Sequence, residues 1–160
     1  MDIGVSEKKT ERSLVKGLVA GLIAGLVATA AKSVAEKFYP PRIHGEPEPP
    51  EVLAEELAGH SLDKSTKAAA SEAIHWGFGA AAGAAYGALV EYYPAASSKE
   101  GASFGLALMT LTHETALPTT GLSAPAEEQT SREHTSEAAT HLLYGLVAER
   151  VRSFVRGLLG

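Results

Sequence analysis

The feature that most constrains the fold is an uncharged, mostly apolar stretch near the N-terminus. Residues 17–31 carry no charged side chain, and Lys16 and Lys32 lie on either side of them. As an α-helix rising 1.5 Å per residue, the apolar stretch 14–34 is about 30 Å long, which matches the hydrocarbon core of a bilayer. The flanking lysines can extend their ammonium groups to the lipid headgroups. This stretch predicts a membrane-spanning helix.

Two further stretches have a similar character. Residues 68–93 have no charge between Glu72 and Glu91, and residues 101–117 are interrupted only by His113 and Glu114. A proline follows directly at position 118, and proline ends most helices because it lacks an N–H group. The short acidic run 51–58, closed by Gly59, predicts a further helix in the connection.

The fourth stretch is weaker, because its neutral part at residues 138–148 is too short to cross a bilayer. Beyond it, apolar residues fall on one helical face and Arg150, Arg152 and Arg156 on the other. This pattern predicts an amphipathic extension that lies on the membrane surface or against a partner helix. The fold class is therefore all-α: a four-helix transmembrane bundle with an amphipathic C-terminal helix extension. We expect one membrane domain over residues 1–160, with helices near 13–38, 66–93, 98–117 and 131–158 and a proline-rich acidic loop at 39–65.

Two helix starts carry a capping box, in which a hydroxyl and a carboxylate each accept a hydrogen bond from a backbone N–H. These are Ser97–Glu100 and Thr130–Glu133. An alternative exists for the first helix, because the small residues 28–30 resemble a cleavage site and residues 1–30 could be a cleaved signal. The helical pattern continues past that site to Phe38, which favours a retained helix.

Glycines recur every fourth residue in the first two helices. Inside a helix in water, each glycine costs about 1 kcal/mol relative to alanine. In lipid, the same glycines let two helix backbones approach closely. The contact can lie within the bundle, or it can join copies in a homo-oligomer through Gly17, Gly21 and Gly25. The corresponding glycines of the second helix are Gly79, Gly83 and Gly87.

The distribution of lysine and arginine predicts the orientation. The two termini and the connection 91–100 together hold eight of these residues, and the opposite side holds six. Cytoplasmic loops are enriched in Lys and Arg, so both termini are expected in the cytoplasm of a multi-pass membrane protein.

This topology gathers ionisable side chains at one level of the bundle. Because successive helices alternate in direction, His75, His113, Glu137 and His141 fall in the outer half, and burial cost turns them inward. We expect them to form one interior cluster. Its edge is expected to include Lys32, Glu36 and Glu114, and Glu114 and His134 are further possible metal ligands.

Three interpretations of this cluster stay open. It can be a set of hydrogen bonds between helices, or a proton-responsive site, because histidine titrates near neutral pH. It can also bind a divalent metal through His75, His113, Glu137 and His141, since imidazole and carboxylate suit zinc, iron and manganese. The paired Glu-x-x-His pattern of di-iron bundles is missing from the sequence.

Several function classes do not fit the sequence. The formal charge of -5 argues against nucleic acid binding, which needs a clustered basic face. There is no cysteine, and no nucleophile elbow, phosphate-binding glycine loop or HExxH motif, so no enzyme is predicted. Two functions are expected instead: a membrane protein with a proton- or metal-linked His/Glu layer, or a membrane scaffold or assembly factor without a chemical site.

Several short motifs occur in a fixed order: Lys32-x3-Glu36-x3-Pro40-Pro41-Arg42, His75, His113-x4-Pro118-x2-Gly121 and Ser136-Glu137-x3-His141-Leu142. Together these motifs resemble the YagU-like inner-membrane protein family. The resemblance covers about residues 19–152 and implies a multi-span protein of the bacterial inner membrane. It implies no agreed biochemical activity, so no catalytic role follows from it. The chain departs from the family in its acidic, proline-rich first loop and its alanine-rich spans. The residues that carry the resemblance are Lys32, Glu36, Pro40–Arg42, His75, His113, Pro118, Gly121, Ser136, Glu137 and His141.

Overall fold

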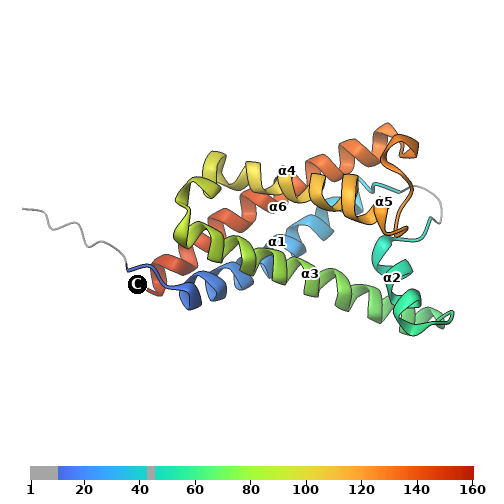
Figure 1. Ribbon diagram of the computed structural model, residues 1–160, viewed down its shortest axis with the longest axis horizontal. Helices are drawn as coiled ribbons and strands as arrows, with labels where there is room; N and C mark the ends of the chain where they lie inside the picture. Colours follow the sequence, from blue (N-terminus) through green and yellow to red (C-terminus); the bar gives the residue numbers. More distant parts are fainter. Residues whose placement is uncertain (1–10, 43–45) are drawn as a thin grey trace, which may run out of the picture.

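The computed structural model describes residues 11–42 and 46–160, and within these residues it is helical without strands (Figure 1). The prediction of an all-α chain is confirmed for this part. Short 3-10 segments at Pro94–Gly101 and Ala126–Glu128 and a π-helical turn at Thr112–Ala116 join the longer elements. The α-helices are α1 (Leu14–Phe38), α2 (Pro49–Ala58), α3 (Lys64–Tyr92), α4 (Ala102–Leu111), α5 (Leu117–Thr119) and α6 (Ser131–Leu158).

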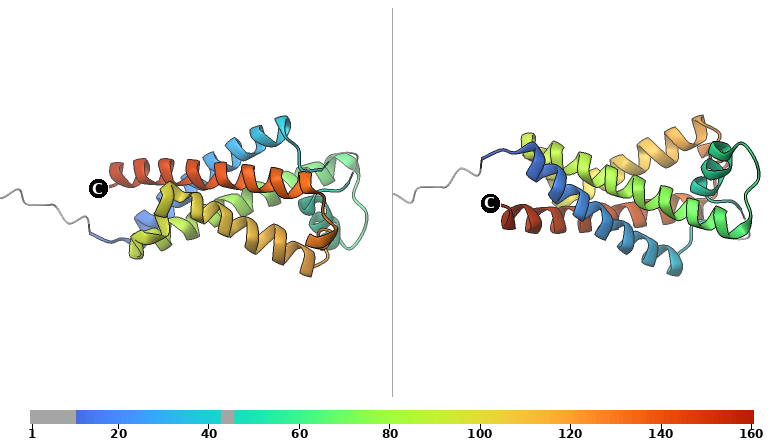
Figure 2. Two further views of the ribbon diagram at one scale, coloured as in Figure 1. Left: turned by 90° about the horizontal axis from the view of Figure 1, so that it is seen from above. Right: turned by 90° about the horizontal axis from the view of Figure 1, so that it is seen from below.

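Helix α1 packs along both α3 and α6 and lies on one side of the bundle (Figure 2). Helix α4 packs on α6, and α2 packs on α3. The start of α1 and the end of α6 lie at the same end, where Lys16 donates a hydrogen bond to the Gly160 carbonyl at 2.6 Å. We call this the terminal end, and the opposite end, which carries α2, the α2 end (Figure 1).

Small residues allow α1 and α3 to approach closely. A Cβ atom added to Gly21 would lie 2.2 Å from the Gly83 carbonyl oxygen, and one added to Gly25 would lie 2.4 Å from the Gly79 carbonyl oxygen. These glycines therefore face another helix of the same chain. Their role in a homo-oligomer stays a prediction.

Large apolar side chains of α1 point away from the bundle. The buried positions of α1 hold small residues together with Thr29 and Lys32. The same inversion occurs in the last turns of α6, where Phe154 is 68% exposed and Arg156 only 8%. The exposed large apolar residues of α1 are Leu14, Val15, Leu18, Val19, Leu22, Ile23, Leu26, Val27, Val34 and Phe38.

Hydropathy alone identifies fewer spans than the sequence pattern predicted. Among the helices of the described residues, only α1 combines enough length with enough apolar character to cross a membrane, with a mean hydropathy of 2.0. A signal sequence or the core helix of a soluble protein can pass the same test. The four-span bundle is thus a proposal, to which we return below.

One predicted helix start is wrong and the other is confirmed. The chain from Pro94 to Gly101 forms a 3-10 segment, and α4 begins only at Ala102. Gly101 sets this start: its φ is 87°, and a Cβ there would lie 2.2 Å from the Gly145 carbonyl oxygen of α6. At α6, Glu133 N–H donates to the Thr130 hydroxyl at 3.2 Å and Thr130 N–H donates to the Glu133 carboxylate at 2.8 Å, so that capping box is present.

The expectation that Pro118 stops the third helix is also wrong. The helical path continues through the π-helical turn Thr112–Ala116 into α5, which ends at Thr119. In that turn Leu117 N–H donates to the Thr112 carbonyl, five residues back. The wider turn shifts the hydrogen-bond pattern before the proline, and such turns are frequent at functional sites.

Candidate functional site

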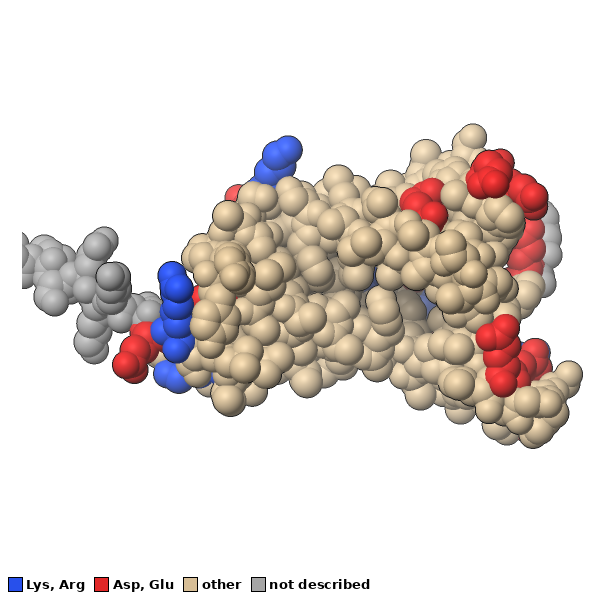
Figure 3. Space-filling model, in the orientation of Figure 1, with Lys and Arg blue, Asp and Glu red and all other residues tan. Residues whose placement is uncertain are grey.

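A cavity of about 450 Å³ lies toward the α2 end of the bundle (Figure 3). Helix α1 contributes Lys32 and Glu36 and helix α6 contributes Glu137 and His141, whereas Ile74, Phe78 and Leu108 of α3 and α4 are apolar. Helix α3 also contributes the polar residues Ser71, Glu72 and His75, and prolines of the first loop and of α2 line the cavity as well. The cavity therefore has a polar wall at α1 and α6, and its apolar wall is formed by α4 and part of α3.

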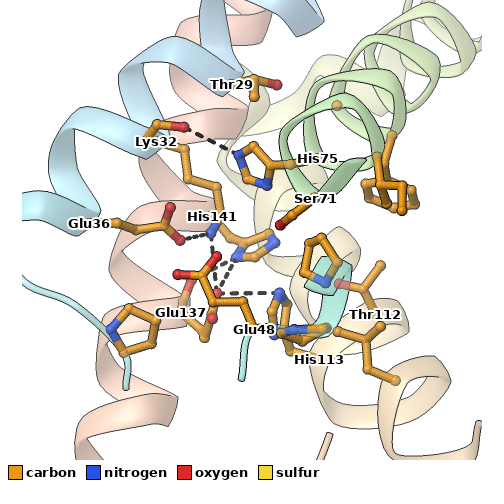
Figure 4. Close-up of a pocket in the computed structure, with 18 of the residues that line it drawn as sticks. Thr29, Lys32, Glu36, Glu48, Ser71, His75, Thr112, His113, Glu137 and His141 are labelled. Carbon is orange, nitrogen blue, oxygen red and sulfur yellow. Dashed lines mark hydrogen bonds and ion pairs between the residues drawn. The ribbon is translucent and has the colours of Figure 1, made fainter. Parts of the chain in front are cut away.

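The Glu137 carboxylate is the centre of the polar wall (Figure 4). The residue is only 3% exposed. Its Oε2 atom lies 3.4 Å from His113 Nε2, 3.4 Å from His141 Nδ1 and 3.3 Å from Lys32 Nζ. Its Oε1 atom lies 3.9 Å from Arg42 Nη1. Such an anion is tolerable at this depth because several positive or hydrogen-bonding groups surround it.

Helix geometry fixes the orientation of His141. Its Nδ1 atom lies 2.9 Å from the backbone carbonyl oxygen of Glu137, one turn earlier. A carbonyl only accepts hydrogen bonds, so Nδ1 carries the proton and Nε2 keeps a free lone pair. The ring of His113, which comes from the π-helical turn, meets the His141 ring edge-on at 4.9 Å between centroids.

Three of the four predicted site residues come together. Ligand atoms of His113, Glu137 and His141 all lie within 4.8 Å of one another. His75 lines the same cavity but stands apart, with its Nε2 atom 3.2 Å from the Ser33 hydroxyl.

The predicted edge of the cluster divides into two parts. Lys32 is at the edge, as expected, and forms ion pairs with both Glu137 and Glu36. Glu114 and His134 instead pair with each other at 2.9 Å, away from Glu137. That pair joins the π-helical turn to the first turn of α6.

Sequence reasoning did not assign a site role to Arg42 or Glu133. Arg42 Nε lies 3.9 Å from Glu133 Oε1, and the same guanidinium faces Glu137. Arg42 had two signals in the sequence: it belongs to the Pro40–Arg42 motif of the family resemblance, and it follows two prolines, whose fixed φ restricts how the chain leaves α1.

The charges of the cluster do not cancel. Two cations, Lys32 and Arg42, face three carboxylates, those of Glu36, Glu133 and Glu137, which leaves one negative charge when both histidines are neutral. The cluster can therefore accept further positive charge without becoming strongly cationic.

Glu48 brings a further carboxylate to the cavity, from the residue before α2. Desolvation at the cavity raises the pKa of Glu48, and the nearby Glu36 carboxylate raises it further. Within the described residues it forms no ion pair shorter than 4 Å, so its negative charge is only weakly compensated.

A second set of ion pairs lies at the terminal end. Arg156 of α6 donates to the Glu91 carboxylate of α3 at 2.6 and 2.8 Å. Arg152 donates to Glu149 at the same two distances, and the Tyr86 hydroxyl donates to Glu149 at 2.7 Å. Of the three arginines expected on the outer polar face of α6, Arg152 and Arg156 thus turn inward and Arg156 joins α6 to α3, whereas Arg150 stays exposed and pairs with Glu100.

Fold and site together define an all-helical protein with a buried histidine–glutamate cluster beside a cavity. Residues 26–150 match the family described as protein of unknown function (DUF1440), and the chain belongs to this family. No curated protein and no solved structure matches the chain. Membership of an uncharacterised family is thereby established, while the YagU-like designation stays a prediction.

Proposed function

We propose that the chain is a multi-span membrane protein, with four spans formed by α1, α3, the α4–α5 segment and α6. The observation that supports a bilayer is the inverted distribution of side chains: leucines and valines of α1 are exposed, whereas Lys32 and Glu137 are buried. In water, a large contiguous apolar surface marks a contact site or leads to aggregation. In lipid it is the ordinary outer surface of a bundle, and ionisable groups face inward.

Helix length and charge placement support the same proposal. Helices α1, α3 and α6 contain 25, 29 and 28 residues, and about 20 suffice to cross a bilayer. On the face shown in Figure 3, charged residues gather near the two ends and leave an uncharged band between them. Basic residues dominate at the terminal end, which favours a cytoplasmic location for both termini in a bacterial inner membrane.

We further propose that the site holds one divalent transition metal ion, such as zinc, iron or manganese, at His113, Glu137 and His141. A tetrahedral ion with ligands at 2.0–2.2 Å keeps its ligand atoms about 3.4 Å apart. Glu137 Oε2 already lies 3.4 Å from His113 Nε2, and one ligand atom from each of His113, Glu137 and His141 lies within 4.8 Å of the other two. The hydrogen bond from Nδ1 of His141 to a backbone carbonyl is of the kind that orients metal-binding histidines, and it leaves Nε2 free to bind.

The Lys32 ammonium competes with such an ion, because it lies 3.3 Å from the same Glu137 oxygen. Lys32 also pairs with Glu36, one turn further along α1. If a metal ion bound Glu137, Lys32 would therefore keep its ion pair with Glu36. Three protein ligands would leave a fourth coordination position for water or another ligand, and all three residues line the cavity.

Metal analysis of the purified protein tests the proposal. The protein should be recovered in the membrane fraction, and in mild detergent it should bind about one zinc or manganese ion per chain, measured by elemental analysis and calorimetry. His141→Gln should weaken binding at least about tenfold, because it removes a ligand. The matched control His134→Gln changes a histidine that lies outside the cluster and should leave binding unchanged.

Two results would contradict the membrane and metal proposals. Recovery in the soluble fraction without detergent would rule out the membrane proposal. Membrane recovery with no bound metal, and an intact bundle in His141→Gln, would favour the scaffold alternative, in which the cluster only holds helices together.

A further inference from the structure

Helices α3 and α4 meet at one end of the cavity and separate at the other. Near the terminal end, the Tyr86 ring of α3 stacks on the Phe104 ring of α4 at 4.0 Å between centroids. Toward the α2 end, α3 packs on α1 and α2 whereas α4 continues along α6, so the two helices diverge (Figures 1 and 2). The cavity opens through this wedge to the side of the bundle (Figure 3).

Apolar side chains of α3 and α4 line the cavity on this side. They are Ile74, Leu108 and Phe78, of which Phe78 is 52% exposed, and α3 also contributes the exposed Glu72. In the proposed orientation, this opening faces lipid and not water. A molecule that enters through it must therefore be soluble in the membrane.

The cavity has a different lining toward the α2 end. Pro49, Pro50 and Leu53 of α2 line it there, together with Pro40 and Pro41 of the loop after α1. Glu48, the residue before α2, also lines the cavity and is itself exposed, so the cavity borders water at this end. An amphipathic molecule can therefore place its polar head toward the α2 end and its apolar part toward the lateral opening.

The polar wall offers groups of both signs that are not fully paired. The Arg42 guanidinium is no closer than 3.9 Å to its carboxylate partners, so it can still donate strong hydrogen bonds. The Glu48 side chain projects toward the Lys32–Glu36 pair in Figure 4 and forms no ion pair within the described residues. A phosphate would give Arg42 a close anionic partner, and an ammonium group would give Glu48 a close cationic partner.

We propose that the cavity is a lateral binding site for one membrane lipid whose head carries both a phosphate and a primary amine, as phosphatidylethanolamine does. The head lies between Arg42 and Glu48, and the acyl chains leave through the opening beside Phe78 into the bilayer. A cavity of about 450 Å³ is large enough for the head and the first part of the chains. This inference rests on the membrane part of the proposed function and does not need the metal.

Native mass spectrometry tests the site. The full chain is reconstituted in vesicles that contain equal amounts of phosphatidylethanolamine and phosphatidylglycerol, and it is then released in mild detergent. We expect one retained phosphatidylethanolamine per chain. Glu48→Gln should lower the preference over phosphatidylglycerol about tenfold, the effect of losing one charged hydrogen bond. Glu46→Gln, an exposed change in the same loop, should keep it.

A second pair of variants tests the cavity itself. Ile74→Phe fills the apolar wall and should abolish lipid retention, whereas Leu89→Phe on the exposed surface of α3 should not. Helix content measured by circular dichroism shows whether each variant is folded, and the Glu48 and Glu46 pair remains decisive if Ile74→Phe is not.

Three results would overturn the inference. The first is a membrane-bound protein that retains no lipid. The second is equal retention of both lipids by wild type and by Glu48→Gln. The third is displacement of the lipid by excess inorganic phosphate, which would indicate a site for aqueous anions. Retained lipid without bound zinc would contradict only the metal proposal. A protein that is soluble without detergent would contradict both the membrane proposal and the lipid inference.

Discussion

Substituting Gly21 by alanine should separate α1 from α3. The added Cβ would lie 2.2 Å from the Gly83 carbonyl oxygen and 2.9 Å from the Gly87 Cα, whereas ordinary contact begins at 3.4 Å. The first of these atoms must move by 3.4 − 2.2 = 1.2 Å, and both belong to the backbone, so the helices must shift. Overpacking of this kind costs up to about 3 kcal/mol, and the better helix propensity of alanine returns about 1 kcal/mol, so a loss of about 2 kcal/mol remains.

Reversible unfolding in mixed detergent micelles, followed by circular dichroism, measures this loss. Gly77→Ala is the matched control, because it lies in the same helix pair and a Cβ there has no atom within 4 Å. That control should be as stable as wild type or more stable by up to about 1 kcal/mol. Equal stability of Gly21→Ala and Gly77→Ala would refute the reasoning, since it would mean that α1 and α3 are not in backbone contact.

Three further changes have defined outcomes. Glu91→Gln leaves Arg156 buried without its charged partner and should cost about 3–5 kcal/mol in the same unfolding assay. Tyr144→Phe removes the hydrogen bond from the hydroxyl to the Gly79 carbonyl, 2.6 Å long, and should cost about 1 kcal/mol. Asp63 caps α3, and hydrogen bonds from Ser65 and Thr66 hold the pKa of that carboxylate well below its usual range. Because the pKa of Asp63 is lower in the folded than in the unfolded state, the stabilisation by its carboxylate is complete above the unfolded pKa of about 4 and is lost as the pH falls below that value. Asp63→Asn should therefore make stability depend less on pH in the acid range.

The positions of the polar residues along the chain were enough to predict most of the cluster. Glu137 and His141 are one turn apart on α6, and alternating helix direction brings Lys32 and His113 to their level. His75 lies at a suitable level too, but its ring turns to Ser33. The height of a residue along the bundle follows from counting residues along its helix. The direction in which its side chain points depends on how the helix packs against its neighbours, and the local sequence does not determine that.

The local irregularities were not predictable in the same way. The π-helical turn Thr112–Ala116 leaves no composition signal, and Pro118 after it indicates a helix end when read alone. The late start of α4 depends on Gly101 meeting Gly145, which lies on a helix far away in sequence. Both features arise from tertiary contacts, which override local propensity.

The inward charges of α6 also bear on how the protein is made. A single arginine or aspartate near the middle of an isolated helix costs about 2.5–3.5 kcal/mol on insertion into a bilayer. Helix α6 carries Glu137, Glu149 and Arg152 away from its ends, besides Arg156 in its last turn, so it is a poor candidate to enter the membrane by itself. Helix α1 carries no charge between Lys16 and Lys32 and can insert first. Biogenesis would then proceed in order, with α6 entering last because Glu137 and Arg156 find Lys32 and Glu91 already in place.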